Sequence, residues 1–225
     1  MRILVADDEL TSRTALSAIV KKLGHTTVVV SDGAEGWRRY VEEPFGIVVT
    51  DWLMPELSGI ELARRIRESH ERGEHRPPAG YTWVLVVTSL SAREKCLEAF
   101  QQGVDDLLVK PIDQAQVTAR LSAGQRVIAE HAATKEAAIR GSVAQLQSAL
   151  GSDDPRLTES FDSLIELYRS QDAYAKARAF LRRQIDLIER SSKGEDPRLA
   201  KLKSELSELA TRSDPVLAAH GNEGA

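Results

Sequence analysis

The feature that most constrains this 225-residue chain is a regular alternation of short apolar runs and amphipathic stretches through its first half. Apolar runs separated by helical patterns are typical of parallel strands whose sheet is covered by helices on both faces. Because crossover connections are right-handed, few topologies satisfy the pattern. Residues 1–122 are therefore predicted to form an α/β domain with a five-stranded parallel sheet. The predicted strands are 3–6, 27–30, 47–50, 83–87 and 107–109.

Four stretches between these runs carry apolar residues at helical spacing. The predicted core-facing residues are Ala15, Ile19, Val20 and Leu23; Ala34, Trp37 and Val41; Ile60, Leu62, Ala63 and Ile66; and Cys96, Leu97, Ala99 and Phe100. The polar segment 69–80 contains His70 and His75 but no nearby cysteine, so we predict a solvated loop rather than a metal site.

Polar residues follow four of the five predicted strands. Asp7 and Asp8 follow the first strand, Asp51 the third, Thr88 the fourth and Lys110 the fifth. Because the carboxyl ends of parallel strands meet at one sheet edge, these side chains are expected to gather there. Clustered carboxylates suit a magnesium ion, and a carboxylate can act as a nucleophile toward a phosphoryl group. Each residue alone has a structural explanation, as a cap, a turn residue or a surface lysine; the combination predicts a cation and phosphoryl site.

Composition narrows the class of protein. The net charge of −4, with both signs mixed, gives no broad electrostatic footprint for nucleic acid. A single cysteine excludes an internal disulfide and is typical of a reducing compartment. No apolar stretch approaches the roughly 20 residues that span a bilayer, and the chain enters a strand without a signal-peptide pattern. We therefore expect a cytoplasmic protein without membrane contact.

From Gln114 onward the pattern is entirely helical. Gly124 and Gly141 interrupt its apolar seam, and each weakens a helix by about 1 kcal/mol relative to alanine. One helix over 114–149 would extend about 54 Å at a rise of about 1.5 Å per residue, so its distal half must pack on something else. The seam comprises Val117, Leu121, Ile128, Ile139, Val143, Leu146 and Leu150.

An internal repeat follows this helix. The segment Asp154-Pro155-Arg156-Leu157 recurs 42 residues later as Asp196-Pro197-Arg198-Leu199. A repeat period of this length indicates a helical-repeat architecture. In each copy the aspartate is expected to cap a helix that has proline at its first position. Downstream, Leu164 and Leu167 match Leu206 and Leu209. The first repeat has one helix face at Leu157, Phe161, Leu164 and Tyr168, and a facing helix at Tyr174, Ala177, Leu181, Ile185 and Ile188.

The first half resembles the receiver domain of two-component response regulators. The resemblance rests on the segments ILVADDE, VVTDWLMPELSGIEL, VLVVTS and GVDDLLVKPID, in order and in spacing. It implies a flavodoxin-like, doubly wound fold for residues 1–122. It also implies that Asp51 accepts a phosphoryl group from a histidine kinase or a phosphotransfer protein. The cofactor implied is Mg²⁺, held by Asp8, Asp51 and the backbone carbonyl of Leu53, with Asp7 acting largely through bound water.

The same resemblance assigns further roles and shows two departures. Thr88 would bond one phosphoryl oxygen and Lys110 another, and the bond before Pro111 would be cis. Leu107 replaces the aromatic residue that usually turns inward on phosphorylation, so we expect a smaller side-chain shift. Apolar residues flank the path of the attacking water, which predicts slow self-dephosphorylation; they are Leu53 and Leu90.

The second half resembles tetratricopeptide repeats of the kinesin-light-chain kind over about one and a half units. The residues that match the packing positions are Leu164, Tyr168, Ala177 and Leu181, whereas Ile165 and Gln184 depart from the pattern. The expected organisation is a receiver domain over 1–122, a connecting helix over 123–150, an all-α helical-repeat unit over 151–212 and a disordered tail over 213–225.

These features predict a response regulator rather than an enzyme with a separate substrate. Phosphorylation would switch binding of a downstream protein, or formation of a homodimer, through the C-terminal helices. Two alternatives remain. One is a transcription or RNA-level regulator whose helices touch nucleic acid, against which the mixed charge counts; the other is a scaffold that never switches.

Overall fold

The computed structural model describes residues 1–212 except 90–92, 152–153, 155, 172 and 193–195. The chain divides into two compact units, Met1–His131 and Ala132–Ala225. None of the described helices combines the length and the apolar character needed to cross a membrane. In chain order the elements are β1 (Arg2–Ala6), α1 (Leu10–Lys22), β2 (Thr26–Val30), α2 (Gly33–Glu42), β3 (Ile47–Asp51), α3 (Gly59–Glu71), β4 (Trp83–Thr88), α4 (Arg93–Gln101), β5 (Asp106–Val109), α5 (Gln114–Leu150), α6 (Leu157–Ser170), α7 (Tyr174–Ser192) and α8 (Arg198–Ala210).

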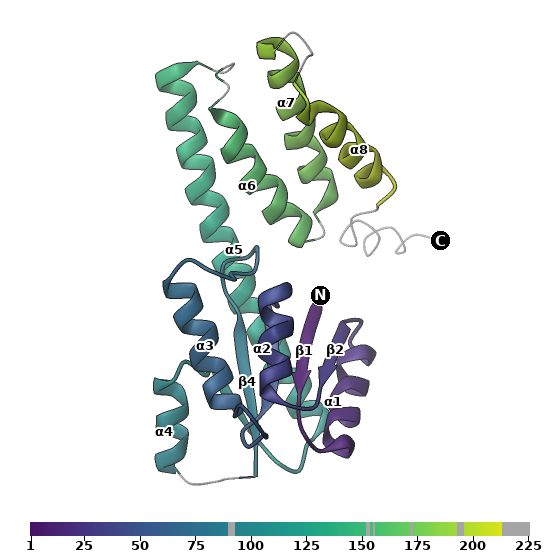
Figure 1. The fold of residues 1–225 in the computed structure, drawn as a ribbon, viewed down its shortest axis with the longest axis vertical. Helices are drawn as coiled ribbons and strands as arrows, with labels where there is room; N and C mark the ends of the chain where they lie inside the picture. Colours follow the sequence, from purple (N-terminus) through teal and green to yellow (C-terminus); the bar gives the residue numbers. More distant parts are fainter. Residues whose placement is uncertain (90–92, 152–153, 155, 172, 193–195, 213–225) are drawn as a thin grey trace, which may run out of the picture. The chain divides into compact units, whose positions relative to one another are not determined.

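The first unit is built on a five-stranded parallel sheet with strand order β2-β1-β3-β4-β5. Strand order reverses at β1, the pattern of a doubly wound flavodoxin-like fold. The predicted fold class is therefore confirmed (Figure 1).

Helices cover both faces of this sheet. On one face, alternate strand residues such as Leu4, Val48 and Val86 pack with side chains of α2, α3 and α4. Because side chains alternate along a strand, Val5 and Val49 face the opposite side, where α1 and α5 lie. The strands carry few polar residues because both of their faces are buried.

Local sequence signals fix the start of two of these helices. Asp32 caps α2 by accepting a hydrogen bond from the Glu35 N–H at 2.7 Å. Ser58 and Glu61 form a capping box at the start of α3, with the Glu61 N–H donating to Ser58 Oγ and the Ser58 N–H donating to the Glu61 carboxylate. The capping box sets the end of the loop that follows β3.

The predicted core face of α4 is partly wrong. Ala99 is fully buried, but Leu97 is 60% exposed and Phe100 is 48% exposed. Four apolar residues within five positions extend beyond one helix face, so two of them cannot reach the sheet. The side chain of Cys96 and all of Leu90 lie outside the described residues.

The predicted solvated loop over 69–80 is also wrong in its first part. α3 continues to Glu71, and His70 lies one turn beyond Ile66 on the buried face, only 8% exposed. His70 Nε2 is 2.9 Å from the Tyr40 hydroxyl, which is 2.5 Å from Thr82 Oγ1. Burial, with the charges of Arg67 and Arg76, lowers the pKa of His70 to about 4.

The second unit contains the distal part of α5 together with α6, α7 and α8. The prediction that the distal half of α5 packs on further structure is confirmed, since Val143 is buried in a core shared with α6, α7 and α8. The other buried members of this core are Leu157, Phe161, Leu164, Ile165, Tyr168, Ala177, Leu181, Ile185, Leu187, Ile188, Leu199 and Leu209.

The two copies of the repeated segment adopt the same local geometry. Asp154 Oδ1 accepts from the Arg156 N–H at 2.9 Å, and Asp196 Oδ1 accepts from the Arg198 N–H at 2.9 Å. In both copies the arginine guanidinium also bonds the aspartate. Both helices begin later than predicted, because each aspartate bonds the N–H two residues further on and so forms a turn that precedes the helix. Pro197 is the N-cap of α8 rather than its first residue. Pro155 and the tail 213–225 lie outside the described residues.

Candidate functional site

The carboxyl ends of four strands bring the predicted polar residues to one edge of the sheet. Asp7 directly follows β1, Asp51 ends β3, Thr88 ends β4 and Lys110 directly follows β5. Parallel pairing aligns these ends. Asp51 of β3 is paired with Val87 of β4, and the Lys110 N–H, just after β5, donates a hydrogen bond to the Thr88 carbonyl of β4 at 2.7 Å.

Three carboxylates and one ammonium group meet at this edge. The carboxylate oxygens of Asp7, Asp8 and Asp51 include a set that lies within 4.8 Å of one another. Asp7 is fully buried, Asp51 is 8% exposed and Asp8 is exposed. Lys110 Nζ lies 3.1 Å from Asp51 Oδ1 and 3.4 Å from Asp7 Oδ2.

Burial changes the pKa values of the groups in this cluster. It raises the pKa of Asp51, and the negative charge of Asp7 adds to that increase, whereas the hydrogen bond and charge of Lys110 oppose it. Burial also acts to lower the pKa of Lys110, but the hydrogen bond to Asp51 and the charges of Asp51 and Asp7 raise it overall. The lysine is therefore held in its charged form beside carboxylates that repel one another.

Asp7 is held by contacts that the sequence did not indicate. Its Oδ1 accepts from the Glu9 N–H at 2.9 Å, and its backbone carbonyl accepts from Arg13 at 2.5 Å. The Glu9 carboxylate lies 3.9 Å from Lys110 Nζ. The available signal for Arg13 was a basic residue in the first turn of the helix that follows the acidic pair.

Two glycines bring the loop after Asp51 close to its neighbours. A Cβ atom on Gly59 would lie 2.0 Å from the backbone oxygen of Asp51, and one on Gly33 would lie 2.0 Å from the backbone oxygen of Leu57. The Gly59 N–H donates to the Trp52 carbonyl at 3.1 Å. Sequence reasoning missed these close approaches, because a glycine at the start of a helix has the same sequence signature whether or not backbone lies against it.

The remaining predicted residues differ in how far they are buried. Thr88 is 1% exposed, whereas Leu53, two residues after Asp51, is 61% exposed. Leu107 is half-buried and packs against the core on the α2–α3–α4 side of the sheet. The Lys110–Pro111 peptide bond is cis.

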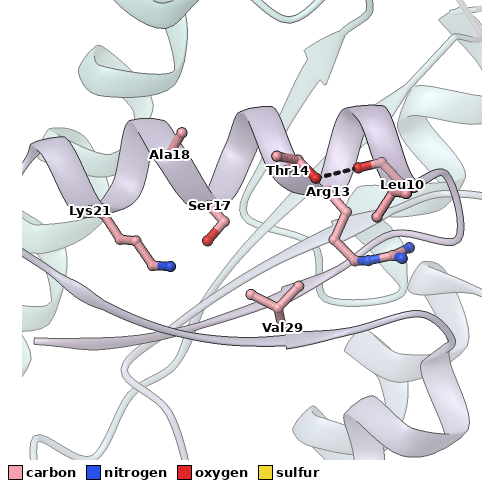
Figure 2. Close-up of a pocket in the computed structure, with 7 residues that line it drawn as sticks. All are labelled: Leu10, Arg13, Thr14, Ser17, Ala18, Lys21 and Val29. Carbon is pink, nitrogen blue, oxygen red and sulfur yellow. Dashed lines mark hydrogen bonds between the residues drawn. The ribbon is translucent and has the colours of Figure 1, made fainter.

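A separate groove lies between α1 and β2, and Figure 2 shows the side chains that line it. Its lining combines apolar and basic residues, and none of the three clustered aspartates belongs to it. The lining residues are Leu10, Arg13, Thr14, Ser17, Ala18, Lys21 and Val29.

The donor set at the strand ends fits a magnesium ion. Mg²⁺ prefers oxygen ligands in an octahedral arrangement and retains several waters, so two or three carboxylates with an open side suit it. The cluster is open to solvent at Asp8, which is exposed, whereas Asp51 is nearly buried. A divalent cation would also offset the repulsion that raises the pKa of Asp51.

Comparisons with known proteins agree with this geometry. Response regulator RppA of Synechocystis sp. is 34% identical over 129 residues, which cover 56% of this chain but only 51% of RppA. Chemotaxis protein CheY-3 of Vibrio cholerae is 35% identical over 122 residues, which cover 54% of this chain and 88% of CheY-3. Transcriptional regulatory protein QseB of Haemophilus influenzae is 28% identical over 170 residues, which cover 75% of this chain and 73% of QseB.

Among solved structures, the receiver domain of the Francisella response regulator 1452 superposes with a TM-score of 0.49 at 26% identity, covering 56% of this chain and 98% of that domain. The family model of the response regulator receiver domain matches residues 3–122, more than half of the sequence. On the strength of that match, the chain belongs to the response regulator receiver family.

Proposed function

We propose that Asp51 accepts a phosphoryl group from a histidine kinase or a phosphotransfer protein. One Asp51 oxygen attacks phosphorus, the new O–P bond forms, and the bond from phosphorus to the donor histidine breaks. Asp8, Asp51 and the Leu53 carbonyl would hold Mg²⁺, with Asp7 acting through bound water. The ion supplies charge neutralisation at the transferring group when it is bound.

The other residues of the cluster act on the phosphoryl oxygens. Lys110 pairs with one oxygen and the Thr88 hydroxyl bonds another, which stabilises the charge that the acceptor gains. The observation that carries this proposal is the position of Lys110 Nζ, 3.1 Å from a nearly buried Asp51 within a group of three carboxylates.

Phosphorylation with a small phosphodonor tests the proposal. The full chain is incubated with acetyl phosphate, with and without Mg²⁺, and intact-mass spectrometry measures phosphoryl incorporation. We expect incorporation only with Mg²⁺, and none in Asp51→Asn. Trp52 adjoins the acceptor, so its fluorescence should change when Mg²⁺ and beryllofluoride are added together. A chain that is never phosphorylated would instead be the non-switching scaffold.

We further propose that the phosphorylated protein loses its phosphoryl group slowly. Leu53 is apolar and exposed beside Asp51, so it offers no hydrogen bond to an attacking water. Replacing it by asparagine should shorten the lifetime of phosphorylated Asp51, measured by loss of mass-shifted protein. A wild-type lifetime of seconds would contradict this proposal.

The second unit is proposed as the output, acting on a protein partner or through a homodimer. The repeated Asp-Pro-Arg-Leu turns favour a tetratricopeptide-like unit, an architecture suited to binding proteins. Molar mass by light scattering, with and without beryllofluoride, distinguishes a switched dimer from binding of another protein.

A transcription or RNA-level regulator is the second candidate. The similarity to QseB covers 75% of this chain and so extends past the receiver domain. Affinity for nucleic acid that falls steeply with salt would favour it, and no binding at low salt would dismiss it.

We also propose that the protein acts in the cytoplasm, where its single cysteine would stay reduced.

A further inference from the structure

Four basic side chains of the second unit lie over aromatic rings: Arg212 lies over Tyr174, and the other three lie over rings of α6 and α7. We call Arg140 of α5 with Lys176 and Arg183 of α7 the cationic stripe. Lys176 and Arg140 are 57% and 49% exposed at their side chains, and Arg183 is exposed. The distances from cation to ring centroid are 5.2 Å for Lys176 and Tyr168, 5.3 Å for Arg183 and Phe161, 5.9 Å for Arg140 and Tyr168, and 5.5 Å for Arg140 and Phe180.

The positive charge of the stripe is mostly uncompensated. Glu136 is the carboxylate nearest to it, 2.9 Å from Arg140 Nε and 4.0 Å from Lys176 Nζ. Within the part of the chain that the structure describes, Arg183 has a ring contact and no carboxylate ion pair. A ring attracts a cation without cancelling its charge, so three cations share one carboxylate.

Four other basic residues of this unit are neutralised locally. Each has its own carboxylate within 3.2 Å: Arg156 with Asp154, Arg169 with Glu205, Arg198 with Asp196, and Lys203 with Glu189. The stripe therefore differs from these four residues in the partners of its cations.

The aromatic rings distinguish between two kinds of anionic partner. Proteins that bind single-stranded nucleic acid expose aromatic faces on which bases stack. Here Tyr168 and Phe161 are fully buried beneath the cations, so their faces are not available to a base. Lys176 and Arg183 are seven residues apart, about 10 Å along α7, a spacing that acidic side chains of a peptide can match.

We propose that the cationic stripe is a docking surface for an acidic segment of a partner protein. The role of this contact as an output rests on the proposed function, but the contact itself requires no phosphorylation. Its failure can therefore be separated from failure of phosphoryl transfer at Asp51.

Binding of a fluorescein-labelled peptide of about twelve glutamates to the unphosphorylated full chain tests the proposal by fluorescence anisotropy at low salt. The Lys176→Gln/Arg183→Gln variant should bind about tenfold more weakly, because it loses two charges that the peptide would pair. The matched control is Lys201→Gln/Lys203→Gln on α8, which removes the same charge from residues that have carboxylate neighbours at 4.0 and 2.7 Å. This control should bind within about twofold of wild type.

Circular dichroism melts of each variant show whether the second unit is folded, and Lys176→Glu gives a second measure that leaves Arg183 on its ring. Weaker peptide binding by Lys176→Glu than by the α8 control supports the proposal. Equal weakening by the stripe and control variants overturns it, as does absence of binding at low salt. Tighter binding of a matched oligouridylate, lost in the stripe variants, would identify a nucleic-acid surface instead.

Discussion

His70 makes the stability of the receiver domain depend on pH, and the effect can be worked out from its surroundings. The imidazole is 8% exposed and bonded to the Tyr40 hydroxyl, and its pKa of about 4 lies below the ordinary 6.5. As pH falls, the unfolded chain takes up a proton at His70 before the folded chain does. The stability that neutral His70 contributes is present above pH 6.5 and is lost between pH 6.5 and about 4.

The size of the effect follows from the two pKa values. At pH 5 the unfolded state is almost fully protonated at this residue and the folded state almost unprotonated, which costs about 2 kcal/mol relative to pH 8. His70→Gln keeps a side chain able to bond the Tyr40 hydroxyl but removes the titration. The difference in unfolding free energy between wild type and this variant should therefore change by about 2 kcal/mol from pH 8 to pH 5.

Urea unfolding followed by tryptophan fluorescence measures this selectively, because Trp37, Trp52 and Trp83 all belong to the first unit. Other groups that titrate in acid are common to both proteins and cancel in the difference. The Tyr40→Phe variant serves as a control, since it loses the hydrogen bond but should keep the pH dependence. Parallel stability profiles for wild type and His70→Gln, within about 0.5 kcal/mol, would refute the reasoning.

Three glycine substitutions give further predictions. Gly59→Ala would place a Cβ 2.0 Å from the backbone oxygen of Asp51, so acetyl phosphate should no longer phosphorylate a chain whose far-ultraviolet circular dichroism is retained. Gly124→Ala would place a Cβ 2.6 Å from the Trp83 ring, and crowding of about 1–3 kcal/mol should exceed the gain in helix propensity and lower the urea midpoint of the first unit. Gly141→Ala, in the same helix but with open space around it, should stabilise the second unit by up to about 1 kcal/mol in a thermal melt; a loss would contradict the geometry.

The sheet and its site could be predicted from the sequence because both depend on short-range patterns. Near-continuous apolar runs identify buried parallel strands, and residues that directly follow such strands must meet at one edge. The positions of Asp51 and Lys110 follow from this rule, although 59 positions separate them in the chain. No knowledge of helix packing was required.

Features that depend on packing between distant elements were not predictable in the same way. Arg67 illustrates this, because it bonds the carbonyls of Gly103 and Thr82 and the carboxylate of Asp105 at 2.6 Å. These partners come from two segments, the residues just before β4 and the connection between α4 and β5, and nothing local marks an arginine in α3 as their shared donor. His70 was misjudged for a related reason: its polar neighbours in sequence indicated a loop, whereas its helical spacing from Ile66 decided its burial.

The helical repeat shows a pattern that is only partly repeated, and the difference has a physical meaning. α8 keeps the leucines that α6 buries, with Leu199 and Leu209 buried and Leu206 half-buried. It lacks the second apolar face of α6, since the positions of Phe161, Ile165 and Tyr168 become Lys203, Ser207 and Ala210, all exposed. A terminal repeat needs a polar outer face because no further helix covers it. α8 therefore has the composition of a capping helix, so its polar outer face is a weaker candidate for a binding surface than the cationic stripe.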